Sequence, residues 1–240
     1  MSAALAGQVA LVTGAGRGIG RAIALAFAAE GAAVALAART RQDLAAVAAE
    51  VRERGGRALA VPTDVTQDAA VEKLVEEIVG DFGRLDILVT AAGTASFGPV
   101  AGAKPADWDA MLAVNLRAVM VCCRAVLPIM IRQRRGTILN VASVAAQRAI
   151  PGGAAYAATK AGVVAWSRVL AEELRAERVR VGVLSPGAVD TPLWDAIPNG
   201  PDRARMLRPE DVARAAVLMV SLPPGASLEE LTLLPAGGIL

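Results

Sequence analysis

Short apolar runs recur along this chain, and longer amphipathic stretches separate them. The short runs are apolar throughout instead of alternating between apolar and polar residues, which is typical of strands covered on both faces of a sheet. The pattern predicts strands at residues 8–14, 32–38, 57–63, 85–93, 136–143, 179–187 and 230–238.

The stretches between these runs have the periodicity of helices that bury one face. They predict helices at residues 18–30, 40–54, 67–82, 106–133, 154–177 and 209–221. Alternation of strand and helix over the whole chain is typical of βαβ units with right-handed crossovers. We therefore expect an α/β fold with a doubly wound parallel sheet of about seven strands and helices on both faces.

We expect a single domain over residues 1–240, because no composition shift divides the chain. The stretch at about 190–208 is rich in Pro and Gly but too short to separate domains, and we interpret it as a substrate flap. Ligands of doubly wound sheets bind beyond the carboxyl ends of the strands. The residues that follow each strand are therefore the candidates for a site.

Composition and charge exclude several classes of protein. The chain is 55% hydrophobic and carries a formal net charge of +2, with acidic and basic residues spread along it. It has no concentrated basic stripe for nucleic acid, no apolar run of about 18 residues or more, and no signal peptide at its beginning. We expect a cytoplasmic protein that binds neither nucleic acid nor a membrane.

The chain contains no histidine and only two cysteines. Cys122 and Cys123 are adjacent in an apolar segment, which suits neither a disulfide framework nor a zinc site, so we expect both to be buried and no metal to be bound. Without histidine, acid–base chemistry must use another side chain.

A glycine-rich segment, TGAGRGIG, follows the first predicted strand and opens the first predicted helix. Glycine allows the backbone to approach a pyrophosphate closely, and the helix start offers free N–H groups. The segment predicts a nucleotide site rather than a plain turn. Its candidate contacts are Gly14, Arg17, Gly18, Ile19 and Gly20.

The end of the second predicted strand predicts which nucleotide binds. A site for NAD would have an acidic residue there, but the chain has Ala38 followed by Arg39. Arg17 and Arg39 suit a 2′-phosphate, so we predict NADPH; the alternative is that both are solvated surface charges. Asp64, with Val65 beside it, is placed to meet the adenine, unless it only forms a turn.

Tyr156 is the only tyrosine of the chain, and Lys160 is one of three lysines. Four residues apart on a helix, they project from the same face. A phenol has a pKa of about 10, and a neighbouring ammonium group favours the phenolate. The pair is a candidate acid–base catalyst. Ser143, at a strand end, and Asn115, among apolar neighbours, are further candidates for polar roles.

These features resemble the short-chain dehydrogenase/reductase family over essentially the whole chain. TGAGRGIG is similar to the cofactor loop of that family, SPGAVDTP at 185–192 to the segment before its substrate flap, and its catalytic tetrad is matched by Asn115, Ser143, Tyr156 and Lys160. The resemblance implies a Rossmann fold and a hydride transfer between a nicotinamide and a carbonyl carbon.

The resemblance also implies roles for individual residues in the direction of reduction. Tyr156 would be the general acid, and Ser143 would hold the carbonyl oxygen. Lys160 would lower the pKa of Tyr156 and bind the nicotinamide ribose, and Asn115 would position a water that passes protons to Lys160. The remaining cofactor contacts would be Ala92, Gly93, Pro186, Gly187, Val189 and Thr191.

The chain departs from the family pattern in two places. The segment usually written Asn-Asn-Ala-Gly is TAAG here, from Thr90 to Gly93, which puts the local rigidity of the sheet centre in doubt. The C-terminal LEELTLLPAGGIL is similar to a branch with hydroxy acid and other small-alcohol dehydrogenases. An NADP-dependent dehydrogenase of that kind is therefore an alternative function.

The expected substrate pocket is mostly apolar, which favours a neutral ketone or aldehyde. Its predicted walls are Ala145, Gln147, Ile150, Pro186, Trp194 and Ile197. A 3-oxoacyl thioester on a carrier protein is one candidate substrate, because a basic rim for an acidic partner is available from Arg148, Arg203, Arg205 and Arg208. A sensor that binds NADPH without turnover is the alternative from another class.

We expect a homodimer or a homotetramer, as in the family. The predicted helices 106–133 and 154–177 have alanine-rich faces that permit close packing across a two-fold axis. On the second helix this face would include Ala161, Ala165 and Trp166.

Overall fold

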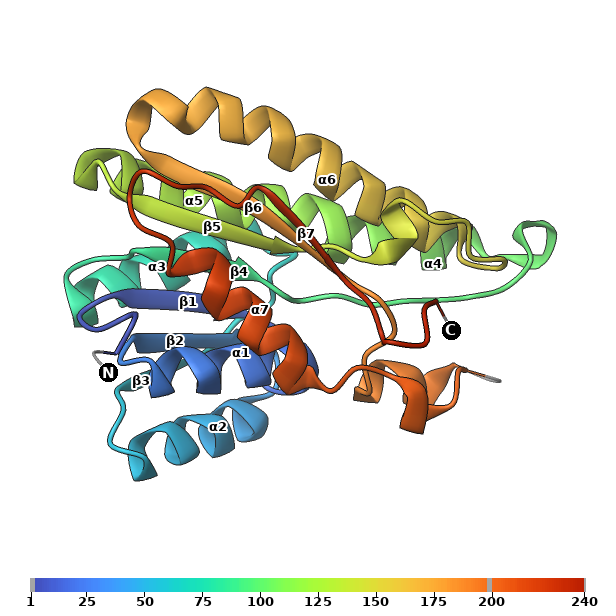
Figure 1. Ribbon diagram of the computed structural model, residues 1–240, viewed down its shortest axis with the longest axis horizontal. Coiled ribbons are helices and arrows are strands. Elements are labelled where there is room, and N and C mark those ends of the chain that lie inside the picture. Colours follow the sequence, from blue (N-terminus) through green and yellow to red (C-terminus); the bar gives the residue numbers. More distant parts are fainter. Residues whose placement is uncertain (1–2, 198–199, 240) are drawn as a thin grey trace.

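The computed structural model describes residues 3–197 and 200–239 and contains one parallel sheet (Figure 1). Its strands are β1 (Val9–Thr13), β2 (Ala33–Ala38), β3 (Ala58–Pro62), β4 (Ile87–Thr90), β5 (Gly136–Val141), β6 (Val179–Pro186) and β7 (Glu230–Leu233). They form a 7-stranded sheet in the order β3-β2-β1-β4-β5-β6-β7. The predicted fold class and strand number are confirmed.

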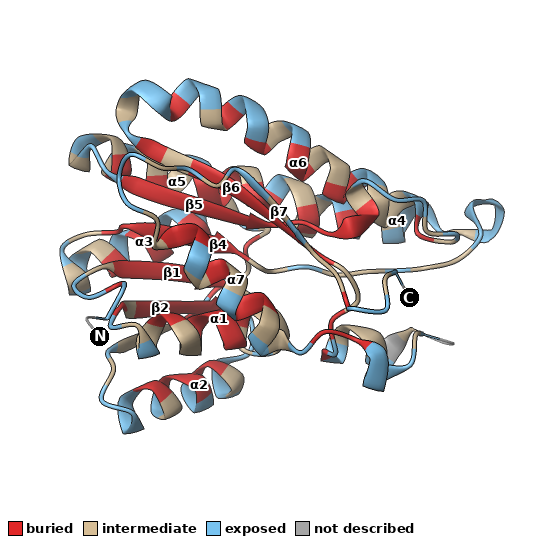
Figure 2. Cartoon of the chain, in the orientation of Figure 1, coloured by how far each residue is buried: buried red, intermediate tan, exposed pale blue. Residues whose placement is uncertain are grey.

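Helices cover both faces of the sheet. They are α1 (Gly18–Ala29), α2 (Arg41–Glu53), α3 (Asp68–Phe82), α4 (Pro105–Leu112), α5 (Ala118–Gln133), α6 (Ala154–Leu174) and α7 (Pro209–Val220). In β1, Val9 and Leu11 join the apolar core under α3, α5 and α6, whereas Ala10 and Val12 join the core under α1, α2 and α7. The inner strands β1, β2, β4, β5 and β6 are buried along most of their length (Figure 2), as their continuous apolar runs predict. The outer strands β3 and β7 are mostly half-buried or exposed.

The helix predicted at 106–133 is interrupted. A π-helical turn, Ala113–Arg117, separates α4 from α5 and contains the buried Asn115. Turns of this type insert one extra residue and occur often at functional sites. Here the turn carries the side chain of Asn115 toward the loop that follows β4, as its hydrogen bonds to Thr94 show.

The helical stretch Pro105–Gln133, which includes the π-helical turn, is long and apolar enough to cross a membrane by length and composition, and an 18-residue window of it has a mean hydropathy of 1.8. It lies against the sheet, however, and its inward side chains, including Val119, Cys122 and Met130, are part of the core. Its apolar character is therefore explained by packing inside the fold. Both cysteines are buried and free, as expected.

The two outer strands of the sheet are β3 and β7. At β3, the guanidinium group of Arg52 donates a hydrogen bond to the carbonyl of Ala58, and the strand ends at Pro62. At β7, Glu230 accepts two hydrogen bonds from Arg168 on α6.

The predicted flap contains two short 3-10 helices, Pro192–Ala196 and Arg203–Arg205. Residues 198 and 199 of the predicted flap lie outside the described residues. Arg203 connects the two helices, because its guanidinium group contacts Asp190 and Asp195 at 2.6 Å each. It also donates to the carbonyl of Thr191 at 3.2 Å. The described part of the flap is therefore held together around Arg203.

The strand order reverses between β1 and β4. The chain adds β2 and β3 on one side of β1, and then adds β4 to β7 on the other side. At such a point the connections leave the sheet on opposite sides and open a crevice at the carboxyl ends of the strands.

Candidate active site

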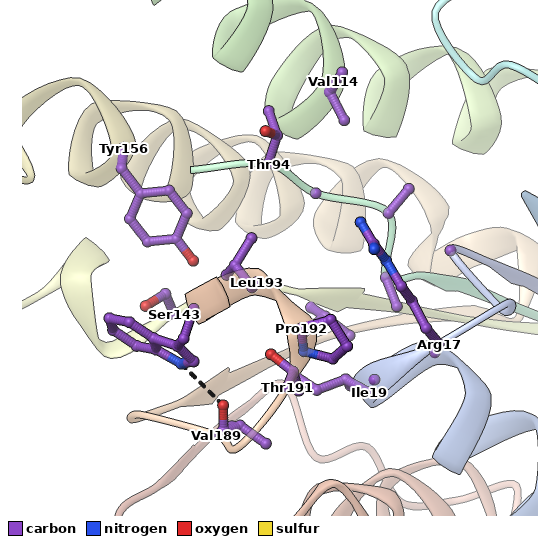
Figure 3. A pocket seen from close by; sticks show the side chains of 18 of the residues that line it. Arg17, Ile19, Thr94, Val114, Ser143, Tyr156, Val189, Thr191, Pro192 and Leu193 are labelled. Carbon is purple, nitrogen blue, oxygen red and sulfur yellow. Dashed lines mark hydrogen bonds between the residues drawn. The ribbon is translucent and has the colours of Figure 1, made fainter. Parts of the chain in front are cut away.

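One cavity of about 850 Å³ opens at the carboxyl ends of the strands (Figure 3). The residues that follow β1, β2, β4, β5 and β6 line it, together with residues of α6 and the flap. All sixteen predicted cofactor contacts lie in its wall: Gly14, Arg17, Gly18, Ile19, Gly20, Arg39, Asp64, Val65, Ala92, Gly93, Tyr156, Lys160, Pro186, Gly187, Val189 and Thr191.

The glycine-rich loop packs against the end of β4. Gly14 has a φ of +68°, and a Cβ there would lie 2.8 Å from the Cα of Ala92, so this position requires glycine. The hydroxyl of Thr13 accepts the N–H groups of Ala91 and Ala92 at 3.1 and 3.3 Å. The loop therefore presents bare backbone to the cavity next to the start of α1, which suits a pyrophosphate.

The nucleotide end of the cavity also contains a carboxylate that sequence reasoning missed. Asp43, in the first turn of α2, lines the cavity with Arg17 and Arg39. Its Cβ lies 3.0 Å from the position that a Cβ on Gly16 would occupy. In the sequence, Asp43 is one acidic residue near the start of a helix and does not directly follow β2. Its position next to the glycine-rich loop could therefore not be predicted.

Asp64 forms a turn. One of its carboxylate oxygens accepts the N–H and the hydroxyl of Thr66 at 3.0 and 2.8 Å. These hydrogen bonds hold the pKa of the Asp64 carboxyl below its usual range, and the nearby Arg39 lowers it further. The turn is thus present, and the side chain also lines the cavity, so its contact with an adenine stays a prediction.

The candidate catalytic side chains Ser143, Tyr156 and Lys160 line the same cavity. Figure 3 shows Ser143 and Tyr156 in it. Ser143 follows β5, and its hydroxyl accepts the N–H of Ala145 at 3.1 Å. Tyr156 and Lys160 both come from α6, and the ammonium nitrogen of Lys160 lies 5.9 Å from the centre of the Tyr156 ring. That nitrogen donates to the carbonyl of Val141 at 2.9 Å.

The predicted lowering of the Tyr156 pKa is not found in the protein alone. Burial raises the pKa of the Tyr156 hydroxyl, and a hydrogen bond with Ser143 offsets only part of that effect. Burial also lowers the pKa of Lys160 to about 8. Removal from water disfavours both charged forms, and in this structure that effect outweighs the attraction between ammonium and phenolate.

Asn115 is fully buried behind the cavity wall. Its side-chain oxygen accepts the N–H of Thr94 at 2.8 Å, and its amide group donates to the carbonyl of Thr94 and to the hydroxyl of Thr159. In the structure Asn115 therefore fixes the loop after β4 to α6. Its predicted role in a proton path to Lys160 stays a prediction.

The TAAG segment is braced in a way that the sequence did not indicate. The hydroxyl of Thr90 donates to the side-chain oxygen of Asn140 on the neighbouring β5 at 2.7 Å. Asn140 in turn donates to Ser167 of α6 at 2.9 Å. A hydroxyl thus connects the sheet centre to a buried polar chain, which answers the doubt about rigidity.

The substrate end of the cavity differs in part from the prediction. Ile150, Pro186, Trp194 and Ile197 line it, but the wall does not include Ala145 or Gln147. The 3-10 turn after Ser143 buries Ala145 and exposes Gln147, and contact of either residue with a substrate stays a prediction. Lining residues that sequence reasoning missed include Phe97, Val114, Pro151, Leu193 and Ile239.

The predicted basic rim is weaker than expected. Arg203 is paired with Asp190 and Asp195, and Arg208 lies 3.5 Å from Asp211. Two carboxylates thus neutralise Arg203, whereas Arg208 shares Asp211 with Arg214. Arg148 and Arg205 remain as exposed cations.

The site therefore places a phosphate-binding loop, a serine, a tyrosine and a lysine around one cavity. The family model described as "short chain dehydrogenase" matches residues 8–202. The chain belongs to the short-chain dehydrogenase family.

Two reductases and one solved oxidoreductase are similar to the chain over nearly its full length. It is 35% identical to the 3-oxoacyl-[acyl-carrier-protein] reductase of Thermotoga maritima, over 90% of this chain and 92% of the relative. It is 37% identical to the corresponding reductase of Synechocystis sp., over 99% of this chain and 98% of the relative. A solved metagenomic short-chain oxidoreductase in complex with NADP is 37% identical, with a TM-score of 0.85, over 97% of this chain and 99% of that chain.

Proposed function

We propose that this short-chain dehydrogenase reduces a ketone or an aldehyde to an alcohol with NADPH. The observation that carries the proposal is that Ser143, Tyr156 and Lys160 share one cavity with the glycine-rich loop. Two arginines, Arg17 and Arg39, support NADPH over NADH, and the solved metagenomic oxidoreductase was described in complex with NADP.

The residues present fit this cofactor. The backbone around Gly14 leaves no room for a side chain, Arg17 and Arg39 suit the 2′-phosphate, and Lys160 is placed for the nicotinamide ribose. When bound, NADPH supplies a hydride to the carbonyl carbon.

The protein would stabilise and protonate the carbonyl oxygen. Ser143 donates a hydrogen bond to that oxygen, and Tyr156 gives it a proton as the new alcohol forms. The raised pKa keeps the Tyr156 hydroxyl protonated at neutral pH, so the group is ready to act as an acid. Lys160, with a pKa of about 8, is suited to return a proton to Tyr156.

A 3-oxoacyl thioester is the substrate class favoured by the names of the relatives from Thermotoga maritima and Synechocystis sp.. The pairing of Arg203 and Arg208 with carboxylates argues against an extended basic rim for a carrier protein. A free thioester or another neutral ketone therefore fits the described surface better than a carrier-bound one. The dehydrogenase of small alcohols or hydroxy acids remains the second candidate, suggested by the C-terminal sequence.

The test is NADPH oxidation, with NADH in parallel, against 3-oxoacyl thioesters, aryl and alkyl ketones, and aldehydes. We expect turnover with NADPH, and Tyr156→Phe should reduce kcat by about 10²- to 10⁴-fold while NADPH still binds. A Tyr156→Phe enzyme within a few-fold of the parent would show that another group is the acid. NADPH binding without any turnover in the parent would favour the sensor.

We also propose a homodimer or homotetramer that uses α6. Small or apolar side chains spaced three or four residues apart form a stripe on this helix, at Ala158, Ala161, Ala165 and Val169. Ala161 is half-buried and the other three are exposed, Val169 to 59%. Such a stripe permits close packing against a second copy. Trp166, which was expected on the same face, packs partly against the core instead.

A further inference from the structure

Three aromatic rings, one of them that of Tyr156, meet in the wall of the cavity. The ring of Phe97 lies 5.7 Å from that of Tyr156 and 6.1 Å from that of Trp194, measured between centroids, and the Phe97 and Trp194 planes differ by only 18°. The chain has three Phe, one Tyr and three Trp, so three of its seven aromatic side chains gather here. All three line the cavity.

Phe97 is held in place by the segment that leads into α6. The N–H of the next residue, Gly98, donates to the carbonyl of Gly152 at 2.9 Å. The ring also fits over Gly153, because a Cβ there would lie 3.1 Å from the Cε1 atom of Phe97. Gly153 directly precedes the helix of Tyr156, so the position of Phe97 is coupled to that of the catalytic residue.

Trp194 is held by the flap. Its ring N–H donates to the carbonyl of Val189 at 3.0 Å, shown by the dashed line in Figure 3. The ring lies against Gly200, where a Cβ would be 3.2 Å from the Cε3 atom of the indole. Phe97 and Trp194 therefore come from different segments, and contacts with the surrounding backbone fix both.

The charged groups in the described cavity wall lie at the nucleotide end, except for Lys160, whose ammonium nitrogen is 5.9 Å from the centre of the Tyr156 ring. Arg17, Arg39, Asp43 and Asp64 follow the first three strands at the nucleotide end, and Lys160 is buried against the carbonyl of Val141. The described lining residues also include apolar side chains such as Ile150, Pro151 and Leu193. Phe97 and Trp194 themselves offer no charged partner for a carboxylate.

We propose that Phe97 and Trp194 form an aromatic wall that makes the enzyme selective for a carbonyl carbon bearing an aryl group. The proposal rests on the proposed carbonyl reduction and specifies its substrate class. Aromatic rings attract one another through their quadrupoles in addition to burying area, so an aryl group gains more from this wall than a saturated ring of the same carbon skeleton.

The experiment compares acetophenone with cyclohexyl methyl ketone, which differ only in the aromaticity of the ring. The measured quantity is the ratio of their kcat/KM values with NADPH, in the parent, Phe97→Leu and Trp194→Leu. The ratio is kcat/KM for acetophenone divided by kcat/KM for cyclohexyl methyl ketone. We expect each substitution to reduce this ratio by about three- to tenfold, with the KM for NADPH unchanged. The change in ratio cancels the different intrinsic reactivities of the two ketones.

Two matched variants control for the substitutions themselves. Phe82→Leu makes the same replacement at a partly buried ring at the end of α3, outside the cavity. Trp194→Phe keeps an aromatic ring but removes the N–H that donates to Val189. Both should keep the parent ratio, and thermal melting shows which variants fold.

The outcomes separate this proposal from the proposed function. A reduced ratio in Phe97→Leu or Trp194→Leu, with the parent ratio in Phe82→Leu and Trp194→Phe, supports the aromatic wall. An unchanged ratio in both leucine variants, or turnover of 3-oxoacyl thioesters without turnover of either ketone, overturns the wall alone. No NADPH oxidation by the parent with any carbonyl compound overturns the carbonyl reduction and the wall with it.

Discussion

Lys160 carries its ammonium group in the interior of the protein, with only 5% of the residue exposed. The hydrogen bond to Val141 replaces one contact with water, but no carboxylate accompanies the charge among the described neighbours that affect its pKa. Burial of this kind destabilises the protonated form and explains a pKa of about 8. The lowered pKa brings proton exchange by Lys160 closer to neutral pH, and burial of the charged form destabilises the fold.

This burial predicts a pH dependence of stability. The free energy of unfolding of the parent, measured relative to Lys160→Met, should rise as the pH increases from about 8 to 10.5. In that range the lysine of the unfolded chain keeps its proton while the buried lysine has lost it, so the unfolded state binds more protons and stability increases with pH. The full rise is about 3 kcal/mol.

Urea denaturation of both proteins over this pH range measures the difference. Other groups titrate equally in the two proteins and cancel, provided that Lys160→Met folds in the same way. A difference that stays constant with pH would contradict the buried ammonium group.

The candidate catalytic residues Tyr156 and Lys160 could be predicted from the sequence, because both residue types are rare in this chain and the two are four residues apart. Tyr156 is the only tyrosine, and Lys160 follows it by one helical turn. Phe97 was not predictable, since it lies in a loop without periodicity and gains its position from Gly152 and Gly153, far away in the sequence. The direction of the Tyr156 pKa was also missed, because burial depends on tertiary packing.

At the scale of elements, β4, β5 and α6 are joined by the polar chain from Thr90 through Asn140 to Ser167. Sequence patterns predicted these elements well because each strand is continuously apolar. They did not predict the break between α4 and α5, because the apolar pattern continues through the π-helical turn. The side chain that the turn buries, Asn115, finds its partners only in the folded chain.

Removal of the Thr90 hydroxyl should destabilise the protein. Thr90→Val keeps the shape of the side chain but leaves the buried oxygen of Asn140 with only the weak thiol donor of Cys123 at 3.7 Å. The expected loss in the free energy of unfolding is about 1–3 kcal/mol. Denaturant unfolding measures it, with Thr232→Val on the exposed side of β7 as the control, which should change little. A similar value for both variants would show that the polar chain does not brace the sheet.

Release of the flap should weaken substrate binding more than chemistry. Arg203→Gln removes the cation that holds Asp190 and Asp195 together and contacts Thr191. Because these groups are partly exposed, we expect a rise of about three- to fivefold in the KM of the carbonyl substrate and a smaller change in kcat. Steady-state kinetics measure both, with Arg214→Gln on α7 as a control. An unchanged KM would mean that the flap holds its position without Arg203.

For the whole molecule, the stripe on α6 predicts that assembly depends on small side chains. Ala165→Arg places a long charged side chain in the middle of the stripe formed by Ala158, Ala161, Ala165 and Val169. We expect a shift from dimer or tetramer toward smaller species, seen as a lower mass in light scattering after gel filtration. Lys73→Ala, at an exposed site on α3, should keep the parent mass. A parent mass for Ala165→Arg would place the interface elsewhere.

The outer strands of the sheet have a consequence for aggregation. An unpaired strand edge invites a strand from another molecule, and this sheet has two such edges, β3 and β7. At β3, Pro62 has no N–H to offer, and Arg52 occupies the carbonyl of Ala58. At β7, the strand is only four residues long and carries the charged Glu230, which pairs with Arg168. These features protect the two edge strands of a chain that is 55% hydrophobic from pairing with strands of other molecules in amyloid-like growth.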